Sequence, residues 1–252
     1  MLPLQLNNER FAEALQAARA RVPEGIGTQK EKLLHATLKN YFAGEEDEQE
    51  VPVLGYVADV FGKDGIVEIQ TGSFSKIKEK LSVLTDHYPV TLVCPLMRKK
   101  TVYWLDPRDG SVSGGRGSPK KGAPCHLLWE LLPLCTLAGK EGFRVVIFYY
   151  DGEEYRLADG WSKDGKKGSH RVERVPCTPV DLYELCTIED YHLLLPEKCP
   201  AVFTSKEFAK FSGLKGRKCS AALKMLLELG IVTRVLDGRQ YLYSVCDTSY
   251  LK

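Results

Sequence analysis

Apolar side chains recur at every third or fourth position in several segments of the chain, which is the period of an amphipathic helix. Thr28 and Thr204 each stand three residues before a glutamate, the arrangement of a capping box at a helix N-terminus. Pro89 and Gly230 end two of these patterns, since proline lacks an amide hydrogen and glycine is favoured just after a helix. The predicted helices are 8–21, 28–42, 73–88, 125–137, 204–211 and 215–229.

Shorter apolar runs between Gly, Pro and Asp residues predict strands. Residues 56–61 and 65–71 are separated only by Gly62-Lys63-Asp64-Gly65, so we expect a tight hairpin there. The run 90–95 is apolar throughout, as expected for a strand in the middle of a sheet. The remaining predicted strands are 51–54, 102–105, 143–150, 231–236 and 239–245, the last two joined at Asp237-Gly238.

Two acids interrupt the hairpin between residues 56 and 71. Asp59 lies in its first strand and Glu68 in its second, and Gln70 is on the same face of the sheet as Glu68. Placing a carboxylate in a half-buried strand costs free energy unless a partner offsets it. A divalent cation between the strands would be such a partner, because Mg²⁺ prefers hard oxygen ligands. We therefore take Asp59 and Glu68 as candidate metal ligands.

The predicted order helix, strand, strand, strand, helix, strand around these residues resembles the PD-(D/E)XK nuclease superfamily. The resemblance implies an α/β (α+β) fold, a restriction-endonuclease-like mixed sheet flanked by helices. It also implies that Asp59 and Glu68 bind a catalytic Mg²⁺ or Mn²⁺, with Glu31 as an outer ligand. Gln70 would take the place of the lysine that orients the attacking water, although glutamine cannot supply a positive charge. The chain further departs from the pattern at Ala58, where the family has proline.

Simpler interpretations of the same residues stay open. Glu31 is also the last residue of the capping box that begins at Thr28. His35, one helical turn later, could point into the same cleft or be an ordinary polar residue of the helix. Asp59 and Glu68 could be exposed acids on the solvated face of an antiparallel hairpin.

The two predicted helices and the hairpin at the C-terminal end resemble a winged-helix domain. In such a domain the second helix of the pair enters the major groove of DNA. Winged helices also serve as protein-interaction or dimerisation modules, and surface lysines are common on helices, so that alternative stays open. The candidate DNA-binding residues are Lys215, Arg217, Lys218, Ser220 and Lys224 on the helix, with Arg239 on the wing.

The charge of the chain is unevenly distributed. The net charge is only +2, but seven Lys/Arg against two Asp/Glu lie between residues 98 and 121. Residues 111–122, rich in Gly, Ser and Lys, are expected to form a mobile basic loop. The segment 155–174 combines aromatic and basic residues, and it could hold phosphates or be a solvated hairpin tip. Its candidate phosphate-binding residues are Lys163, Lys166, Lys167 and Arg171.

Length and composition limit the class of protein. With 252 residues we expect three parts: a nuclease-like domain over 1–175, a helical linker over 176–200 and a winged-helix domain over 201–252. No apolar run approaches the roughly 20 residues of a membrane helix, and no signal peptide is evident. The eight cysteines form no Cys-x-x-Cys pair, which argues against a structural zinc site and a secreted disulfide framework. We therefore expect a cytoplasmic protein without a membrane partner.

These observations predict a divalent-metal-dependent DNA nuclease or DNA-processing protein that a winged helix brings to DNA. The alternatives are a catalytically inactive, nuclease-like DNA-binding regulatory or scaffolding protein, and a protein-interaction module. The chain as a whole is similar to an uncharacterised bacterial protein family that pairs a nuclease-like domain with a winged helix. No Gly-x-Ser-x-Gly, phosphate-loop or His-Glu-x-x-His motif competes with this interpretation. The oligomeric state stays open, a homodimer included.

Overall fold

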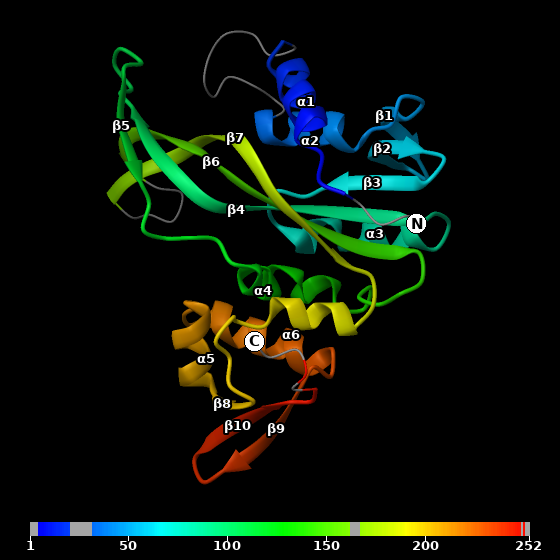
Figure 1. Ribbon diagram of the computed structural model, residues 1–252, viewed down its shortest axis with the longest axis vertical. Coiled ribbons are helices and arrows are strands. Elements are labelled where there is room, and N and C mark those ends of the chain that lie inside the picture. Colours follow the sequence, from blue (N-terminus) through cyan, green and yellow to red (C-terminus); the bar gives the residue numbers. More distant parts are fainter. Residues whose placement is uncertain (1–4, 21–31, 162–166, 248, 250–252) are drawn as a thin grey trace.

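The computed structural model describes residues 5–20, 32–161, 167–247 and 249. It is a mixed α+β structure with one large sheet, helices on both of its faces and a small C-terminal unit (Figure 1). The helices α1 (Asn8–Ala20) and α2 (Leu33–Phe42) cover one face of the sheet. The 3₁₀ turn η1 (Phe74–Ile77), the helix α3 (Lys78–Thr85) and the short helix α4 (Leu128–Leu131) cover the other.

The large sheet has seven strands in the order β1-β2-β3-β4-β6-β7, with β5 paired to β4. The central strands β3, β4 and β6 run parallel to each other, and the outer pairs are antiparallel. The predicted hairpin is confirmed as β2 and β3. The strands are β1 (Glu48–Val53), β2 (Tyr56–Gly62), β3 (Gly65–Ile69), β4 (Val90–Leu105), β5 (Val112–Gly117), β6 (Phe143–Trp161) and β7 (Lys167–Leu185).

Alternate residues of the central strands point to opposite faces and build two cores. On β4, Leu92 belongs to the core under α3 and α4, and Val93 to the core under α1 and α2. Neighbouring residues of β6 divide in the same way, with Ile147 on the first side and Phe148 on the second. This explains why these strands read as continuous apolar runs: both faces are covered.

The C-terminal unit contains η4 (Glu189–Leu194), β8 (Val202–Thr204), α5 (Ser205–Ser212), α6 (Arg217–Glu228), β9 (Val232–Asp237) and β10 (Gln240–Val245). Its three strands form a separate sheet in the order β8-β10-β9. The capping box predicted at Thr204 is confirmed, since its amide donates to Glu207 Oε2 at 2.8 Å and its hydroxyl accepts from the Glu207 amide. Gly213, at φ 70, then ends α5 in the left-handed conformation.

The C-terminal unit shares its core with the large sheet. Leu223 and Leu226 of α6 belong to the same apolar cluster as Leu128 and Leu131 of α4, and α6 lies directly along α4 (Figure 1). The expected helical linker over 176–200 is wrong in its first part, because residues 176–185 continue β7 and pair with β6. The sheet therefore extends past the predicted boundary at residue 175.

Two further segments differ from their predictions. Residues 125–137 form η2 (Pro124–Leu127), α4 and η3 (Leu132–Leu134) rather than one helix. Pro133 explains the break, because it has no amide hydrogen to continue an α-helix. Half of the loop expected at 111–122 is the strand β5, which pairs with the outer half of β4. None of the helices in the described part of the chain is long and apolar enough to cross a membrane.

Candidate active site

Asp59 and Glu68 lie on neighbouring antiparallel strands, at the row where regular pairing stops. The β2–β3 register runs from the turn to Val60 and Val67, one residue short of this row, and the β1–β2 pairing also skips it. Glu50, the β1 residue beside Asp59, has a φ of 57. A positive φ is strained for a residue other than glycine, and strain of this kind is concentrated at functional sites.

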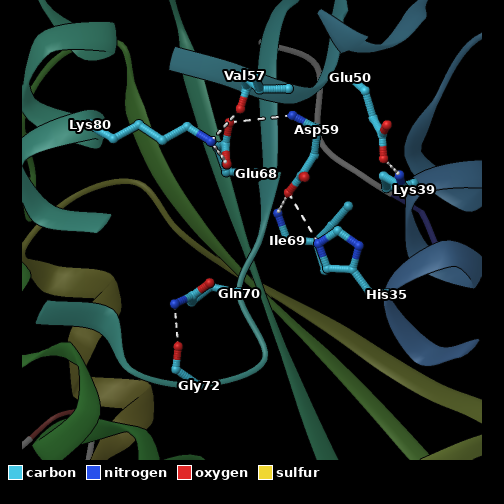
Figure 2. A network of polar contacts seen from close by, with 10 residues as sticks. All are labelled: His35, Lys39, Glu50, Val57, Asp59, Glu68, Ile69, Gln70, Gly72 and Lys80. Atoms are coloured by element: carbon cyan, nitrogen blue, oxygen red, sulfur yellow. Dashed lines mark hydrogen bonds and ion pairs between the residues drawn. The ribbon is translucent and has the colours of Figure 1, made fainter. Parts of the chain in front are cut away.

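Glu68 is buried, with 5% of its surface exposed, and its carboxylate accepts a hydrogen bond from the ammonium group of Lys80. Lys80 of α3 donates to Glu68 Oε2 at 2.5 Å and to the carbonyl oxygen of Val57 at 2.6 Å (Figure 2). The Asp59 amide donates to Glu68 Oε1 at 3.4 Å. One carboxylate thus joins β2, β3 and α3.

Asp59 is bound by an amide of the neighbouring strand and by a side chain from the other face of the sheet. The Ile69 amide donates to Asp59 Oδ2 at 2.7 Å, and His35 Nε2 of α2 lies 3.4 Å from the same oxygen (Figure 2). Because α2 and α3 cover opposite faces, the two carboxylates are held from opposite sides of the strands that carry them. The structure therefore brings His35, Asp59 and Glu68 together around one irregular row.

The two carboxylates have opposite electrostatic settings. Burial, followed by the nearby charge of Asp59, raises the pKa of Glu68 to about 7 against the opposing effect of Lys80. Burial also acts to raise the pKa of Asp59, but the hydrogen bond and charge of His35 and the Ile69 amide together hold that pKa below its usual value. Pairs of acids whose pKa values are pushed apart are typical of functional sites.

Lys80 is the residue that the sequence interpretation missed. The Gln70 side-chain amide donates to the carbonyl oxygen of Gly72, whereas Lys80 brings a nitrogen to Glu68 (Figure 2). The Gln70 amide also donates to the carbonyl oxygen of Ser73. A signal for this was present, because Lys80 occupies a position of the apolar stripe of its helix, three residues after Ile77. The role predicted for Gln70 in orienting water stays a prediction.

The donor set determines which metal could be held here. Glu31, the predicted outer ligand, lies outside the described residues. Within the described ranges, no group of three His, Cys, Asp or Glu side chains is placed to hold a metal ion. Two carboxylates nevertheless fit Mg²⁺, which keeps several waters and is commonly held by one or two carboxylates plus substrate phosphates. Asp59 and Glu68 do not form a closed cage, so a metal held by both would need such an open site.

The predicted DNA-binding side chains are exposed. Arg217, Lys218 and Ser220 lie in the first turn of α6, preceded by Lys215, and Lys224 follows one turn later. Arg239 lies in the turn between β9 and β10.

Lys218 has a partner in the sheet domain. Its Nζ lies 4.1 Å from the centre of the Trp129 ring, which is a cation–π contact between α6 and α4. This residue helps to join the two parts of the chain, and the remaining basic residues of α6 are better candidates for contacts with DNA.

The predicted phosphate-binding segment is the end of a long hairpin. β6 and β7 pair as far as Trp161 and Lys167, so the described part of this segment is a hairpin, and its role in binding phosphate stays a prediction. Lys163 and Lys166 lie outside the described residues. Arg171 is exposed on β7, opposite Arg156 of β6.

Comparison with known proteins gives one family and one relative. The family described as "Domain of unknown function (DUF8091)" matches residues 32–186, more than half of the chain. The chain belongs to this family. A DUF8091 match of this extent begins just before α2 and ends just after β7, so it covers the large sheet and both candidate carboxylates.

An uncharacterised protein of Treponema pallidum (strain Nichols) is 30% identical to this DUF8091 protein over 226 residues. The alignment covers 86% of each chain, so the similarity extends beyond the DUF8091 domain. No solved structure matches the chain.

We expect the stability of this DUF8091 protein to depend on pH through Glu68. The pKa of Glu68 is raised above its unfolded value of 4.5, so its contribution to stability is full below that pH and is lost as the pH rises through about 7. In EDTA, the free energy of unfolding of the wild type should therefore fall between pH 5 and pH 8 relative to Glu68→Gln. Urea denaturation at both pH values measures this difference. Parallel pH profiles for the two proteins would contradict it.

Proposed function

We propose that this protein is a divalent-metal-dependent DNA nuclease, with Asp59 and Glu68 as the metal-binding pair. The observation that carries the proposal is the setting of Glu68, a buried carboxylate next to a second carboxylate, with a pKa of about 7. Two acids in this arrangement repel each other, and a bound divalent cation would relieve that repulsion. The order of α2, β1, β2, β3, α3 and β4 supports the resemblance to PD-(D/E)XK nucleases.

Each residue of the site would have a distinct part in this chemistry. A bound Mg²⁺ or Mn²⁺ supplies an acidified water and stabilises negative charge on a phosphate. Asp59 and Glu68 would supply its carboxylate ligands, and His35 would hold Asp59 in place. Lys80 would keep a positive charge beside Glu68, the charge that Gln70 cannot provide.

The C-terminal unit supports DNA as the substrate. Its order of strand, helix, helix and two-stranded hairpin, and its sheet order β8-β10-β9, agree with the resemblance to a winged helix. In that arrangement α6 is the helix that enters the major groove. Arg217 and Lys224 are exposed there, and neither is the residue that contacts Trp129.

Reversing two charges on α6 should weaken DNA binding. We expect the double variant Arg217→Glu, Lys224→Glu to bind duplex DNA about tenfold or more weakly. The slope of log affinity against log salt concentration should also become less steep, by the amount expected for about two lost phosphate contacts. Fluorescence anisotropy over a range of salt concentrations measures both effects.

The matched control reverses Lys63 and Lys198, two exposed lysines outside α6. DNA affinity that is the same in both double variants would argue against α6 as the DNA-binding element.

A second candidate function is DNA binding without cleavage, in a regulatory or scaffolding protein. The observation that favours it is that Lys80 and His35 already occupy carboxylate oxygens of Glu68 and Asp59, from opposite faces of the sheet. In that case the two acids would be structural, tying α2 and α3 to the strands between them.

Incubation with DNA separates the two functions. Linear, nicked and branched DNA should be cut by the wild type in Mg²⁺ or Mn²⁺, and left intact in EDTA. If DNA binds but is not cut in the presence of either metal ion, the result would favour the second candidate and contradict the nuclease proposal.

A further inference from the structure

A cavity of about 310 Å³ lies beyond the end of β3, on the side of Gln70. Its walls come from β4, β6, β7, the segment that follows β3, and residues 120–130. A volume of this size is at the lower end of the range for small-molecule sites. The cavity is separate from Asp59 and Glu68, which do not line it.

The charged groups of this cavity are mainly basic. Four Lys or Arg residues line it, against Glu130 and Glu154. Glu154, with 4% of its side chain exposed, is already neutralised, since Lys100 Nζ lies 3.0 Å from its Oε1 and Arg156 also donates to that oxygen. Burial raises the pKa of Glu130 above its usual value. The cavity therefore has an excess of positive charge.

Three of the cations are available to a ligand. Lys120 and Lys121 are exposed, on the segment between β5 and η2. Arg174 of β7 forms an ion pair with Glu154, with its Nε 3.9 Å from Oε2, and this buried Nε has no hydrogen-bond partner among the described residues. Groups of this kind are suited to bind a phosphate, which accepts several hydrogen bonds from Arg and Lys.

The rest of the lining is apolar or neutral. Leu96, Met97, Leu127 and Phe74 contribute apolar surface, and Gln70 adds an amide oxygen that can accept a hydrogen bond. An apolar interior with basic residues beside it suits a ligand that joins an anion to a flat, weakly polar body.

We propose that this cavity binds a nucleotide, with the phosphate held by Lys120, Lys121 and Arg174. The basic residues that line the cavity are sufficient to predict an anion site. The choice of a nucleotide among phosphate-bearing ligands rests on the proposed function, because a DNA nuclease meets nucleotides as strand ends and as products.

Binding of dTMP in EDTA tests this proposal, because it needs no metal and no cleavage. By isothermal titration calorimetry we expect the wild type to bind dTMP at least about tenfold more tightly than thymidine, since a hydrogen bond to a charged group contributes enough for such a factor. Lys120→Glu with Lys121→Glu should weaken dTMP binding by at least the same factor. Both residues are exposed, so the variant should fold, which circular dichroism checks. The control is Lys63→Glu with Lys198→Glu, which should leave dTMP binding unchanged.

Three results would overturn the proposal: no binding of dTMP, equal binding of thymidine, or equal binding of dTMP by the Lys120/Lys121 double variant and the wild type. Inorganic phosphate that binds as tightly as dTMP would overturn the choice of a nucleotide.

Competition identifies the source of the ligand. Displacement of dTMP by a 5′-phosphorylated oligonucleotide, but not by its 5′-hydroxyl form, assigns the cavity to strand ends, and displacement by neither assigns it to free nucleotides. If the protein binds dTMP but never cuts DNA, the nuclease proposal is refuted and the proposal of a nucleotide site is not.

Discussion

Glutamine in place of Glu68 should lower the rate of metal-dependent DNA cleavage by about 1,000-fold or more. A metal ion stabilises charge in such reactions by several kcal/mol, and each 1.36 kcal/mol is a factor of ten in rate. Glutamine keeps the shape of Glu68 but removes the charge that would hold the cation between β2 and β3. Single-turnover cleavage of linear DNA in Mg²⁺ measures the effect.

The control for this substitution is Glu79→Gln. Glu79 is exposed on α3, next to Lys80 in sequence, so the change removes the same charge as Glu68→Gln but at a solvent-exposed position. Its cleavage rate should stay within about twofold of the wild type, as expected for a surface substitution. A Glu68→Gln protein that cuts DNA as fast as the Glu79→Gln protein would exclude Glu68 as a metal ligand.

Alanine in place of Phe148 should lower the free energy of unfolding by about 3–5 kcal/mol, the usual effect of deleting a buried phenyl ring. Phe148 of β6 is completely buried beneath α1 and α2. Its ring lies 5.7 Å from that of Phe11 and 5.4 Å from that of Tyr41, measured between centroids. The cavity left by the substitution would loosen both helices from the sheet. Urea denaturation followed by circular dichroism measures the change.

Val112→Ala provides the comparison. Val112 of β5 is 52% exposed, so its truncation should change the free energy of unfolding by about 0.5 kcal/mol or less. If Phe148→Ala were no more destabilising than Val112→Ala, the core beneath α1 and α2 would contribute little to stability.

Strong local patterns were enough to predict several elements. The hairpin of β2 and β3 follows from two apolar runs around a Gly-Lys-Asp-Gly turn, and α5 from the capping box that begins at Thr204. α6 and the pair β9–β10 follow in the same way from an apolar stripe that stops at Gly230 and from the turn at Asp237-Gly238. In each case the signal lies within a few residues of the element.

Elements that depend on distant partners were not predictable. β5 contains no buried residue and has three glycines, so nothing local marks residues 112–117 as a strand. It exists because β4 continues far enough to pair with it, at Tyr103 and Gly114 for example. The extension of β7 to Leu185 likewise depends on pairing with Val145 of β6. Such pairings are tertiary contacts, and the β-propensity of the residues does not predict them.

The residues of the candidate site were also predictable only in part. Asp59 and Glu68 stand out because acids are rare in half-buried strands, and the structure does bring them to neighbouring strands. For Lys80 the apolar stripe indicates only a position near the buried face of α3, because its contact with Glu68 depends on how α3 lies against the sheet. The helical period alone does not show where a long side chain ends.

The apolar cluster shared by α4 and α6 also has a consequence for how DNA would be handled. A DNA-binding unit on a flexible tether would let the active site sample many positions along the duplex. Here Leu128 and Leu131 share one apolar cluster with Leu223 and Leu226, so packed side chains join the two parts. DNA held by α6 would reach Glu68 at one constant spacing. A nuclease built in this way would behave as a molecular ruler, cutting at a set number of base pairs from its point of attachment.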